Sequence, residues 1–176
     1  KGDIINIDVT AILDGWYGDT SRMFIVGEVA SIKAKQIIQT TYKCMMEGIK
    51  KIKPGLNLGD IGYTIEKIAN DNNFSIVKDF CGHGVGKEFH EPPSVLHYGS
   101  QGEGLELKEG MIFTIEPMVN AGTGEIKILS DGWTAVTKDR QLSAQFEHSI
   151  GVTKNSYEIS FSIYLTFSII VRNLFW

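Results

Sequence analysis

Residues 3–26 have a pattern that few folds can accommodate: two strand-like segments separated by a two-residue turn. From Ile5 to Ala11, apolar side chains occupy the odd positions and polar side chains the even positions, which is typical of a strand with one buried face. Asp14-Gly15 favours a type I′ turn, because both residues tolerate a positive φ. Residues 16–26 supply the return strand. The sequence therefore predicts a long antiparallel hairpin.

A two-residue turn also sets the register of this hairpin. Thr10 then pairs with Asp19, and Asp8 pairs with Ser21. Because Asp8 and Thr10 share a face, Asp8 and Asp19 become diagonal neighbours on that face. Two carboxylates about 5 Å apart repel by roughly 3 kcal/mol at an effective dielectric constant of about 20, so a cation or a raised pKa must offset the repulsion. The other interpretation is a pair of solvated strand carboxylates.

Two helical segments follow the hairpin. Residues 31–52 have apolar side chains spaced by four and three residues, which predicts an amphipathic helix. The buried stripe that we expect consists of Ile38, Tyr42, Met45, Ile49 and Ile52. Pro54-Gly55 ends this helix, and a second helix begins at Asn57 as its N-cap and ends in the run 70–73.

Short strand-like segments dominate the rest of the chain. We expect a loop rich in glycine, histidine and proline from Cys81 to Gly104. The expected strands are 74–80, 111–119, 126–129, 133–137, 142–153 and an alternating segment from Ile159 to Ile169. Two helices followed by several antiparallel strands indicate an α+β fold, and the lack of a linker or repeat in the sequence favours a single domain.

The composition excludes several classes of protein. Hydrophobic residues make up 43% of the chain and charged residues 22%, which excludes a disordered or collagen-like chain. The formal net charge is −4, so a nucleic-acid partner is not expected. Cys44 and Cys81 belong to no paired motif and suggest buried thiols in a reducing compartment, although two cysteines also allow one bridge.

A second candidate region is the segment Phe80-Cys81-Gly82-His83-Gly84-Val85-Gly86, which is followed by His90 and His97. Glycines let a backbone approach a ligand or adopt a positive φ. A phosphate-binding loop does not fit, because the segment has neither the Lys-Ser/Thr ending nor the GxGxxG spacing. Two interpretations stay open: a ligand site built around the histidines, or a flexible glycine loop with incidental histidines.

Two glutamates, Glu116 and Glu147, lie within apolar strand-like segments. We expect Glu116 to lie in a largely buried strand, where an unpaired carboxylate is costly. Each glutamate taken alone also fits an ordinary salt-bridged strand residue. With Asp8, Asp19 and His83, however, they form a set of four carboxylates and one imidazole.

Such a set suits a pair of divalent cations. Four carboxylates carry a charge of −4, which two divalent ions neutralise. A site with oxygen ligands and a single imidazole, and without thiolates, suits Mn, Fe, Co or Zn ions. Two adjacent metals acidify a bridging water and stabilise an oxyanion, which is the chemistry of a hydrolase.

These residues resemble the motifs of the type I (bacterial) methionine aminopeptidases. In chain order, the motifs are residues 6–9, 18–21, 80–86 with His90, 95–98, 114–118, 131–134 and 145–148. The resemblance covers residues 1–159, which we take as the catalytic domain, and implies the pita-bread fold, a curved antiparallel sheet with helices on its outer face. Prolidases and aminopeptidase P share this fold and the five ligand types, but their surrounding motifs fit this chain less well.

The resemblance implies a metal-binding role for each of the five matched residues. Asp8 would bind one of two divalent metal ions, and Asp19 and Glu147 would bridge both ions. His83 and Glu116 would complete the coordination of the other ion. The ions would be cobalt, manganese, iron or zinc.

The resemblance also implies catalytic and substrate-binding residues. Glu116 would act as general base, and His90 would donate a hydrogen bond to the scissile amide or its oxyanion. Phe89 and Trp133, together with His90, would line the pocket for a methionine side chain, because a thioether packs well against aromatic edges. For Phe89 and Trp133 the alternative is plain core packing.

The implied activity is removal of the initiator methionine from nascent proteins by hydrolysis of the first peptide bond. The expected partners are nascent polypeptide N-termini, with methionine followed by a small residue, near the ribosome. We expect a cytoplasmic monomer without nucleic-acid or membrane partners. The alternatives are a prolidase- or aminopeptidase P-type hydrolase, and a catalytically inactive pita-bread fragment or binding module.

Two features depart from the family pattern. We expect the N-terminal part of the family's domain, which supplies a further active-site histidine, to be missing from this chain. Residues 160–176 form an apolar tail that differs from the family's ending. Its alternation up to Ile169 favours a strand over a membrane helix.

Overall fold

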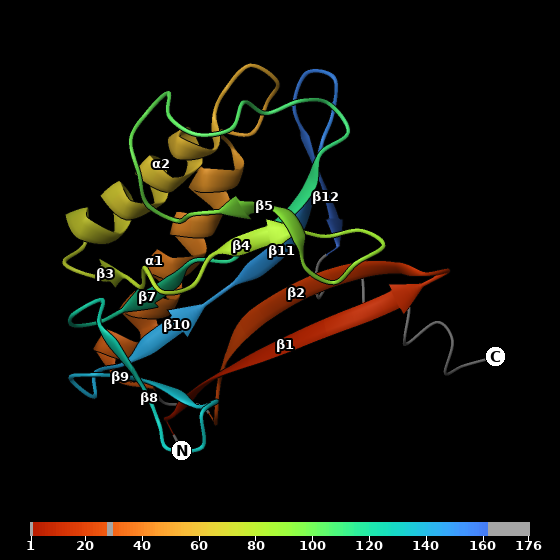
Figure 1. Ribbon diagram of the computed structural model, residues 1–176. Coiled ribbons are helices and arrows are strands. Elements are labelled where there is room, and N and C mark those ends of the chain that lie inside the picture. The colour runs from red at the N-terminus through yellow and green to blue at the C-terminus, as the bar shows by residue number, and fades with distance from the viewer. Residues whose placement is uncertain (1, 28–29, 162–176) are drawn as a thin grey trace.

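The computed structural model describes residues 2–27 and 30–161 (Figure 1). A curved antiparallel sheet has the strand order β1-β2-β11-β6-β4-β5, and β12 pairs with β11. These strands are β1 (Ile4–Leu13), β2 (Trp16–Ile25), β4 (Gly82–Gly84), β5 (Glu91–Val95), β6 (Ile112–Ile115), β11 (Glu147–Val152) and β12 (Tyr157–Phe161). Consecutive strands form the pairs β1–β2, β4–β5 and β11–β12, whereas the pairs β2–β11, β11–β6 and β6–β4 join distant parts of the sequence.

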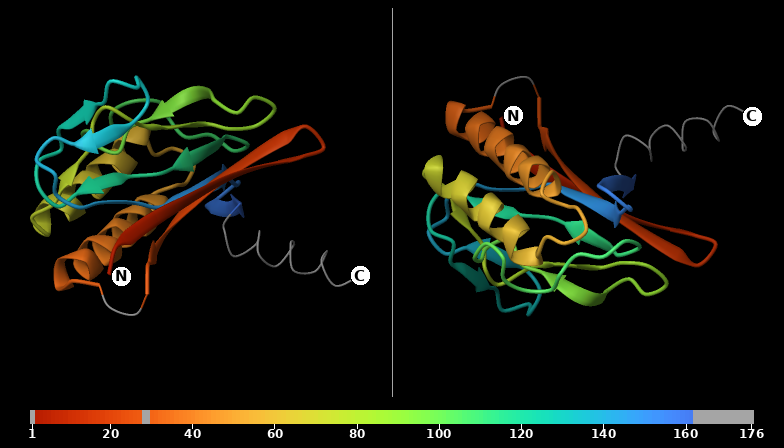
Figure 2. Two further views of the ribbon diagram at one scale, coloured as in Figure 1. Left: turned by 90° about the horizontal axis from the view of Figure 1, so that it is seen from below. Right: turned by 90° about the horizontal axis from the view of Figure 1, so that it is seen from above.

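Smaller elements complete the α+β fold. The helices α1 (Ile32–Ile49) and α2 (Leu58–Asp71) lie side by side on one face of the sheet, and the hairpin of β1 and β2 projects beyond them (Figure 2). A second sheet has the order β10-β7-β3, and a separate hairpin pairs β8 with β9. These strands are β3 (Ser75–Ile76), β7 (Met118–Asn120), β8 (Ile126–Ile128), β9 (Ala135–Thr137) and β10 (Ser143–Gln145).

The predicted N-terminal hairpin is confirmed with its register. Thr10 pairs with Asp19, and Asp8 pairs with Ser21. The turn residues Asp14 and Gly15 have φ angles of 51° and 80°, as a type I′ turn requires. The short turn therefore places Asp8 and Asp19 on one face, as the sequence predicted.

The first helix begins where the sequence predicts and ends at Ile49 rather than at residue 52. Of the expected stripe, Met45, Ile49 and Ile52 are buried. The Ser31 hydroxyl accepts a hydrogen bond from the Ala34 N–H (3.1 Å) and caps the helix. Tyr42, expected in the core, is 45% exposed. Thr41 is fully buried. Its hydroxyl donates a hydrogen bond to the Ile37 carbonyl (2.7 Å), which satisfies this polar group inside the core. Buried positions are predicted from the spacing of large apolar side chains, which does not identify a buried threonine.

The second helix has the predicted N-cap. Asn57 precedes α2 as its N-cap. Its backbone N–H donates to a carboxylate oxygen of Asp60 (2.8 Å) in the first helical turn. An acidic side chain at this position also suits the positive end of the helix dipole.

The predicted loop from Cys81 to Gly104 is wrong for the residues of β4 and β5. Its glycines serve close packing within the sheet. A Cβ atom on Gly82 would lie 2.4 Å from the Thr114 carbonyl oxygen, and one on Gly84 would lie 2.2 Å from the Pro92 carbonyl oxygen. Glycine is required there because neighbouring backbones leave no room for a side chain.

Other strand predictions are confirmed only in part. The expected strand 111–119 breaks after β6 at Glu116-Pro117, and the expected strand 142–153 breaks at Phe146. Pro117 has no backbone N–H to continue a ladder. The strand expected from Ile159 is present as the end of β12, and residues 162–169 lie outside the described residues.

The core lies between the helices and the sheet. Its largest fully buried side chains include Ile37, Met45, Ile65, Phe113 and Ile115. The apolar face predicted for the first strand is largely open in the described chain, since Ile5 and Ile7 are 48% and 43% exposed. Among the described residues, no helix combines the length and the apolar character that a membrane crossing needs.

The packing of α2 predicts an unusual response to a substitution. Alanine is favoured over glycine inside a helix by about 1 kcal/mol. A Cβ on Gly62, however, would lie 2.3 Å from the Tyr98 carbonyl oxygen and 2.8 Å from that of Leu96. We expect Gly62→Ala to lower the free energy of unfolding by about 1–3 kcal/mol, measured by urea denaturation.

The control is Gly151→Ala in β11, where an added Cβ meets no atom within 4 Å. This variant should be at least as stable as the parent chain. A Gly62→Ala variant more stable than the parent would contradict the close approach of α2 to residues 96–98.

Candidate metal centre

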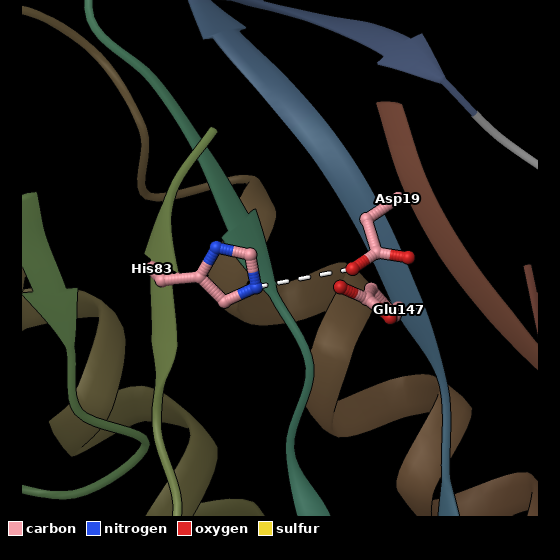
Figure 3. Close-up of side chains that lie close together, drawn as sticks. All are labelled: Asp19, His83 and Glu147. Atoms are coloured by element: carbon pink, nitrogen blue, oxygen red, sulfur yellow. Dashed lines mark ion pairs between the residues drawn. The ribbon is translucent and has the colours of Figure 1, made fainter. Parts of the chain in front are cut away.

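Three side chains from three strands converge on one face of the sheet. Glu147 pairs with Ser21 in the ladder between β11 and β2, so that Asp19, two residues from Ser21, is a diagonal neighbour of Glu147. His83 reaches the same place from β4. Asp19, His83 and Glu147 each offer one ligand atom, and these atoms lie within 4.8 Å of one another (Figure 3).

The remaining two carboxylates border this group. His83 Nε2 lies 3.5 Å from Glu116 Oε1 and 3.9 Å from Asp19 Oδ2. Asp8 is the exposed member of the set. Partial burial, followed by the charge of Asp19 and a hydrogen bond to it, raises the pKa of Asp8 to about 6. All five residues that the sequence singled out as metal ligands are therefore brought together.

The buried glutamates show how crowded the acidic groups are. Burial raises the pKa of Glu116 to about 8, opposed by a hydrogen bond from the Thr114 hydroxyl and reinforced by the charges of Asp19 and Asp8. Burial, followed by the charges of Glu116, Asp19 and Asp8, raises the pKa of Glu147 to about 10. The protein thus holds several acids where their ionised forms repel one another.

Within the described residues, the charge of these acids is not balanced by a side-chain cation. His83 is the basic group that pairs with them, and burial lowers its pKa, so that its neutral form is favoured at pH 7. Glu147 Oε1 is buried and has no hydrogen-bond partner among the described residues. A group of buried carboxylates that includes an oxygen without a hydrogen-bond partner suits a divalent cation, because the ion would bind that oxygen and supply positive charge.

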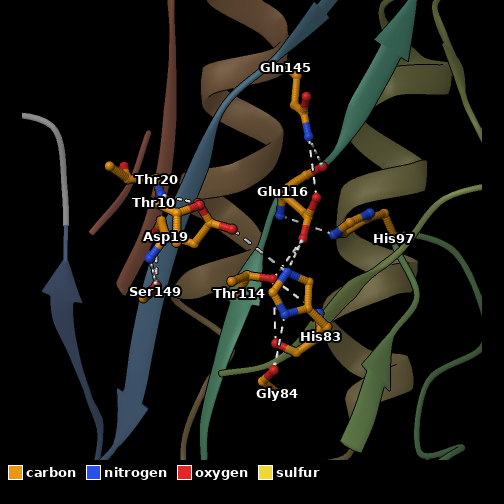
Figure 4. Close-up of polar contacts among 10 residues, drawn as sticks. All are labelled: Thr10, Asp19, Thr20, His83, Gly84, His97, Thr114, Glu116, Gln145 and Ser149. Carbon is orange, nitrogen blue, oxygen red and sulfur yellow. Dashed lines mark hydrogen bonds and ion pairs between the residues drawn. The ribbon is translucent and has the colours of Figure 1, made fainter. Parts of the chain in front are cut away.

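The imidazole of His83 is oriented for coordination. Its Nδ1 lies 3.0 Å from the Gly84 carbonyl oxygen. A carbonyl can only accept, so Nδ1 carries the proton, and Nε2 presents its lone pair to Asp19 and Glu116 (Figure 4). A metal-binding histidine commonly has this arrangement, because the hydrogen bond selects the tautomer.

Neutral groups hold the carboxylates in place. The Thr10 hydroxyl donates to Asp19 Oδ1 (2.9 Å), and the Ser149 hydroxyl bonds both the N–H and the carbonyl of Asp19 (3.0 and 2.8 Å). At Glu116, the Thr114 hydroxyl donates to Oε1 (2.7 Å) and Gln145 Nε2 donates to Oε2 (3.3 Å) (Figure 4). These donors orient the oxygens without neutralising them.

His97 is a residue of this site to which the sequence analysis gave no role. Its Nε2 accepts a hydrogen bond from the Glu116 backbone N–H (3.1 Å). Complete burial lowers the pKa of His97 to about 3, so the ring stays neutral and can accept. The signal in the sequence was a histidine inside the apolar run 95–98.

Glu116 itself differs from its predicted setting. It lies just after β6 rather than inside a strand, at the break before Pro117. Because β6 ends at Ile115, the N–H of Glu116 donates to the His97 side chain rather than to a neighbouring strand. From this position, Glu116 Oε1 lies 3.5 Å from His83 Nε2.

The predicted substrate-binding residues fall into two groups. The His90 ring centroid lies 4.2 Å from that of His83, and the Phe89 ring centroid lies 5.8 Å from it. Trp133 lies in the turn between β8 and β9 and is 89% exposed. The described residues thus bring Phe89 and His90 to the metal-binding cluster and do not enclose the indole of Trp133.

Comparisons with known proteins agree with this geometry. A sequence model of metallopeptidase family M24 matches residues 1–154. The chain belongs to metallopeptidase family M24. The structure of this M24 chain has the predicted pita-bread architecture, a curved antiparallel sheet with two helices on its outer face.

This M24 chain is similar to several methionine aminopeptidases. That of Rickettsia prowazekii is 62% identical over 161 residues, which cover 90% of this chain and 61% of the relative. That of Escherichia coli K12 is 53% identical over 158 residues, which cover 90% of this chain and 60% of the relative. The crystal structure of the Rickettsia enzyme matches with a TM-score of 0.88 at 59% identity and covers 90% of this chain and 64% of that one. This M24 chain therefore spans about three fifths of the length of these relatives.

From the burial of Glu147 among other acids, we predict how Glu147→Gln changes the stability of the chain with and without metal. In EDTA, we expect this variant to raise the free energy of unfolding by about 1–3 kcal/mol, because it removes a buried acid surrounded by acids. Manganese at a hundred times its dissociation constant should stabilise the parent chain by about 2.7 kcal/mol and the variant by much less. Urea denaturation with and without Mn²⁺ measures both effects.

The matched control is Glu158→Gln on the exposed side of β12. It should leave both the stability in EDTA and the gain from Mn²⁺ unchanged. If Glu147→Gln kept the full gain from Mn²⁺, the cluster would not be where the metal binds.

Proposed function

We propose that this M24 chain contains the metal-binding part of a dinuclear aminopeptidase that removes the initiator methionine from nascent proteins. The observation that carries the proposal is the convergence of Asp19, His83 and Glu147, whose ligand atoms lie within 4.8 Å of one another. Glu116 and Asp8 border this group, and Glu147 Oε1 has no hydrogen-bond partner among the described residues. Relatives 62% and 53% identical are methionine aminopeptidases, which supports this substrate class.

Each ligand has a proposed place at two divalent ions. Asp8, Asp19, His83, Glu116 and Glu147 would hold the two ions. Cobalt, manganese, iron and zinc suit this donor set. When bound, such ions supply Lewis-acid chemistry: they neutralise the carboxylates and stabilise negative charge that develops on oxygen during hydrolysis.

The remaining steps belong to side chains. Glu116, which lies 3.5 Å from His83 Nε2, accepts a proton from water as general base. His90, exposed beside His83, donates a hydrogen bond to the scissile amide or to the oxyanion. Phe89 and Trp133 contact the methionine side chain.

The partners follow from this activity. The substrate is a nascent chain that begins with methionine followed by a small residue, met near the ribosome. The protein is proposed to work as a cytoplasmic monomer. The formal net charge of −4 argues against nucleic acid as a partner.

The test is release of methionine from Met-Ala-Ser in the presence of Mn²⁺ or Co²⁺. We expect turnover that EDTA abolishes and that Glu116→Gln lowers by about 10²–10⁴-fold, as the loss of a general base does. Glu158→Gln is the control and should keep the parent rate.

Two other outcomes would replace the proposal. Cleavage of Ala-Pro peptides without cleavage of Met-Ala-Ser would indicate a prolidase- or aminopeptidase P-type hydrolase. Binding of two Mn²⁺ ions in calorimetry without cleavage of either peptide would indicate an inactive fragment or a binding module.

A further inference from the structure

Two separate parts of the chain meet at the edge of the metal-binding cluster. One is the β1–β2 hairpin, which carries Asp8 and Asp19. The other is the segment 85–90 between β4 and β5, which follows His83 and ends at His90 (Figure 1). The Tyr17 N–H donates to the Gly86 carbonyl (2.8 Å) and joins the two parts.

The side chain of Tyr17 makes a second connection. Its ring stacks on that of Phe89, with centroids 5.7 Å apart and planes 23° from parallel. The Phe89 ring in turn lies 4.0 Å from the His90 ring and meets the edge of His83 at 5.8 Å. Tyr17 therefore stands at the outer end of a series of rings that leads to the ligand His83.

The hairpin register explains why Tyr17 reaches this place. Tyr17 precedes Asp19 by two residues, so both side chains lie on the same face of β2. Tyr17 also pairs with Ile12, whereas Asp19 pairs with Thr10. The register that brings Asp19 to the cluster thus also turns the tyrosine ring toward Phe89.

Backbone hydrogen bonds also hold the start of the segment 85–90, where the Val85 N–H donates to the Ile112 carbonyl (3.3 Å) and the Gly86 N–H to the Glu88 carbonyl (3.2 Å). Lys87, Glu88 and His90 are exposed, and Phe89 is half-buried. Lys87 lies over the Trp16 ring at 5.3 Å, but Trp16 is 52% exposed, and cation–π contacts at exposed sites are weak. The stacked rings of Tyr17 and Phe89 are both half-buried, so this contact is more sheltered from solvent than that between Lys87 and Trp16.

We propose that Tyr17 is a positioning residue: by stacking on Phe89 it holds the segment 85–90 so that His90 stays beside His83. This inference rests on the proposed function of His90, and Tyr17 itself contacts neither metal nor scissile bond. It predicts an effect on turnover without an effect on metal binding, because the five ligands come from other positions.

The experiment compares Tyr17→Ala with Tyr17→Phe, which keeps the ring. Leu13→Ala is the control, since Leu13 lies at the same hairpin tip and is 76% exposed. Three quantities are measured on the whole chain: Mn²⁺ stoichiometry and affinity by calorimetry, amide hydrogen exchange of residues 85–90, and kcat and KM on Met-Ala-Ser.

For Tyr17→Ala we expect two bound Mn²⁺ ions with an affinity within about threefold of the parent. Exchange of residues 85–90 should accelerate, and kcat should fall about three- to tenfold, as the loss of one aromatic pair implies, with a smaller change in KM. Tyr17→Phe and Leu13→Ala should match the parent in all three measurements.

The inference is overturned if Tyr17→Ala matches the parent in exchange and kcat, if Leu13→Ala has the same effect, or if Tyr17→Ala loses bound Mn²⁺, which would show general damage to the fold. If the parent chain cleaves no peptide, the proposed function has failed on its own. Exchange and Mn²⁺ binding then decide whether Tyr17 holds the segment.

Discussion

The repulsion between acidic side chains gathered on one face of a sheet is the constraint on which this structure depends. The ionised forms of Asp8, Asp19, Glu116 and Glu147 repel one another, so the carboxylates stay charged together only where a cation supplies positive charge. The described chain supplies a histidine whose neutral form is favoured and leaves one glutamate oxygen without a partner. Divalent cations are the partners that this arrangement suits.

The groups around the carboxylates are consistent with that interpretation. A site built for stability alone would place lysine or arginine against the acids. Here hydroxyl, amide and imidazole groups orient them instead. These neutral donors and acceptors hold the geometry while leaving the negative charge for a metal, and they come from β1, β6, β10 and the segment after β5. The membership of the chain in family M24 agrees with this chemistry.

How much could be predicted depended on whether a feature was local. The hairpin followed from alternation and from Asp14-Gly15, and its register placed Asp8 and Asp19 correctly. The strands β4 and β5 were missed because their glycine-rich sequence is typical of a flexible loop. In the structure, Gly82 and Gly84 instead leave room for the carbonyl groups of neighbouring strands. The exposure of Tyr42 was missed for a related reason, since helix packing selected a stripe that includes Thr41.

The sequence by itself determined the N-terminal hairpin and the α+β class, because turn chemistry and periodicity act over a few residues. Only the tertiary structure decided that β11 lies between β2 and β6, which brings Glu147 beside Asp19, and that His97 supports the backbone of Glu116. These contacts join residues far apart in the chain, and strand pairing and burial, rather than local preference, select them.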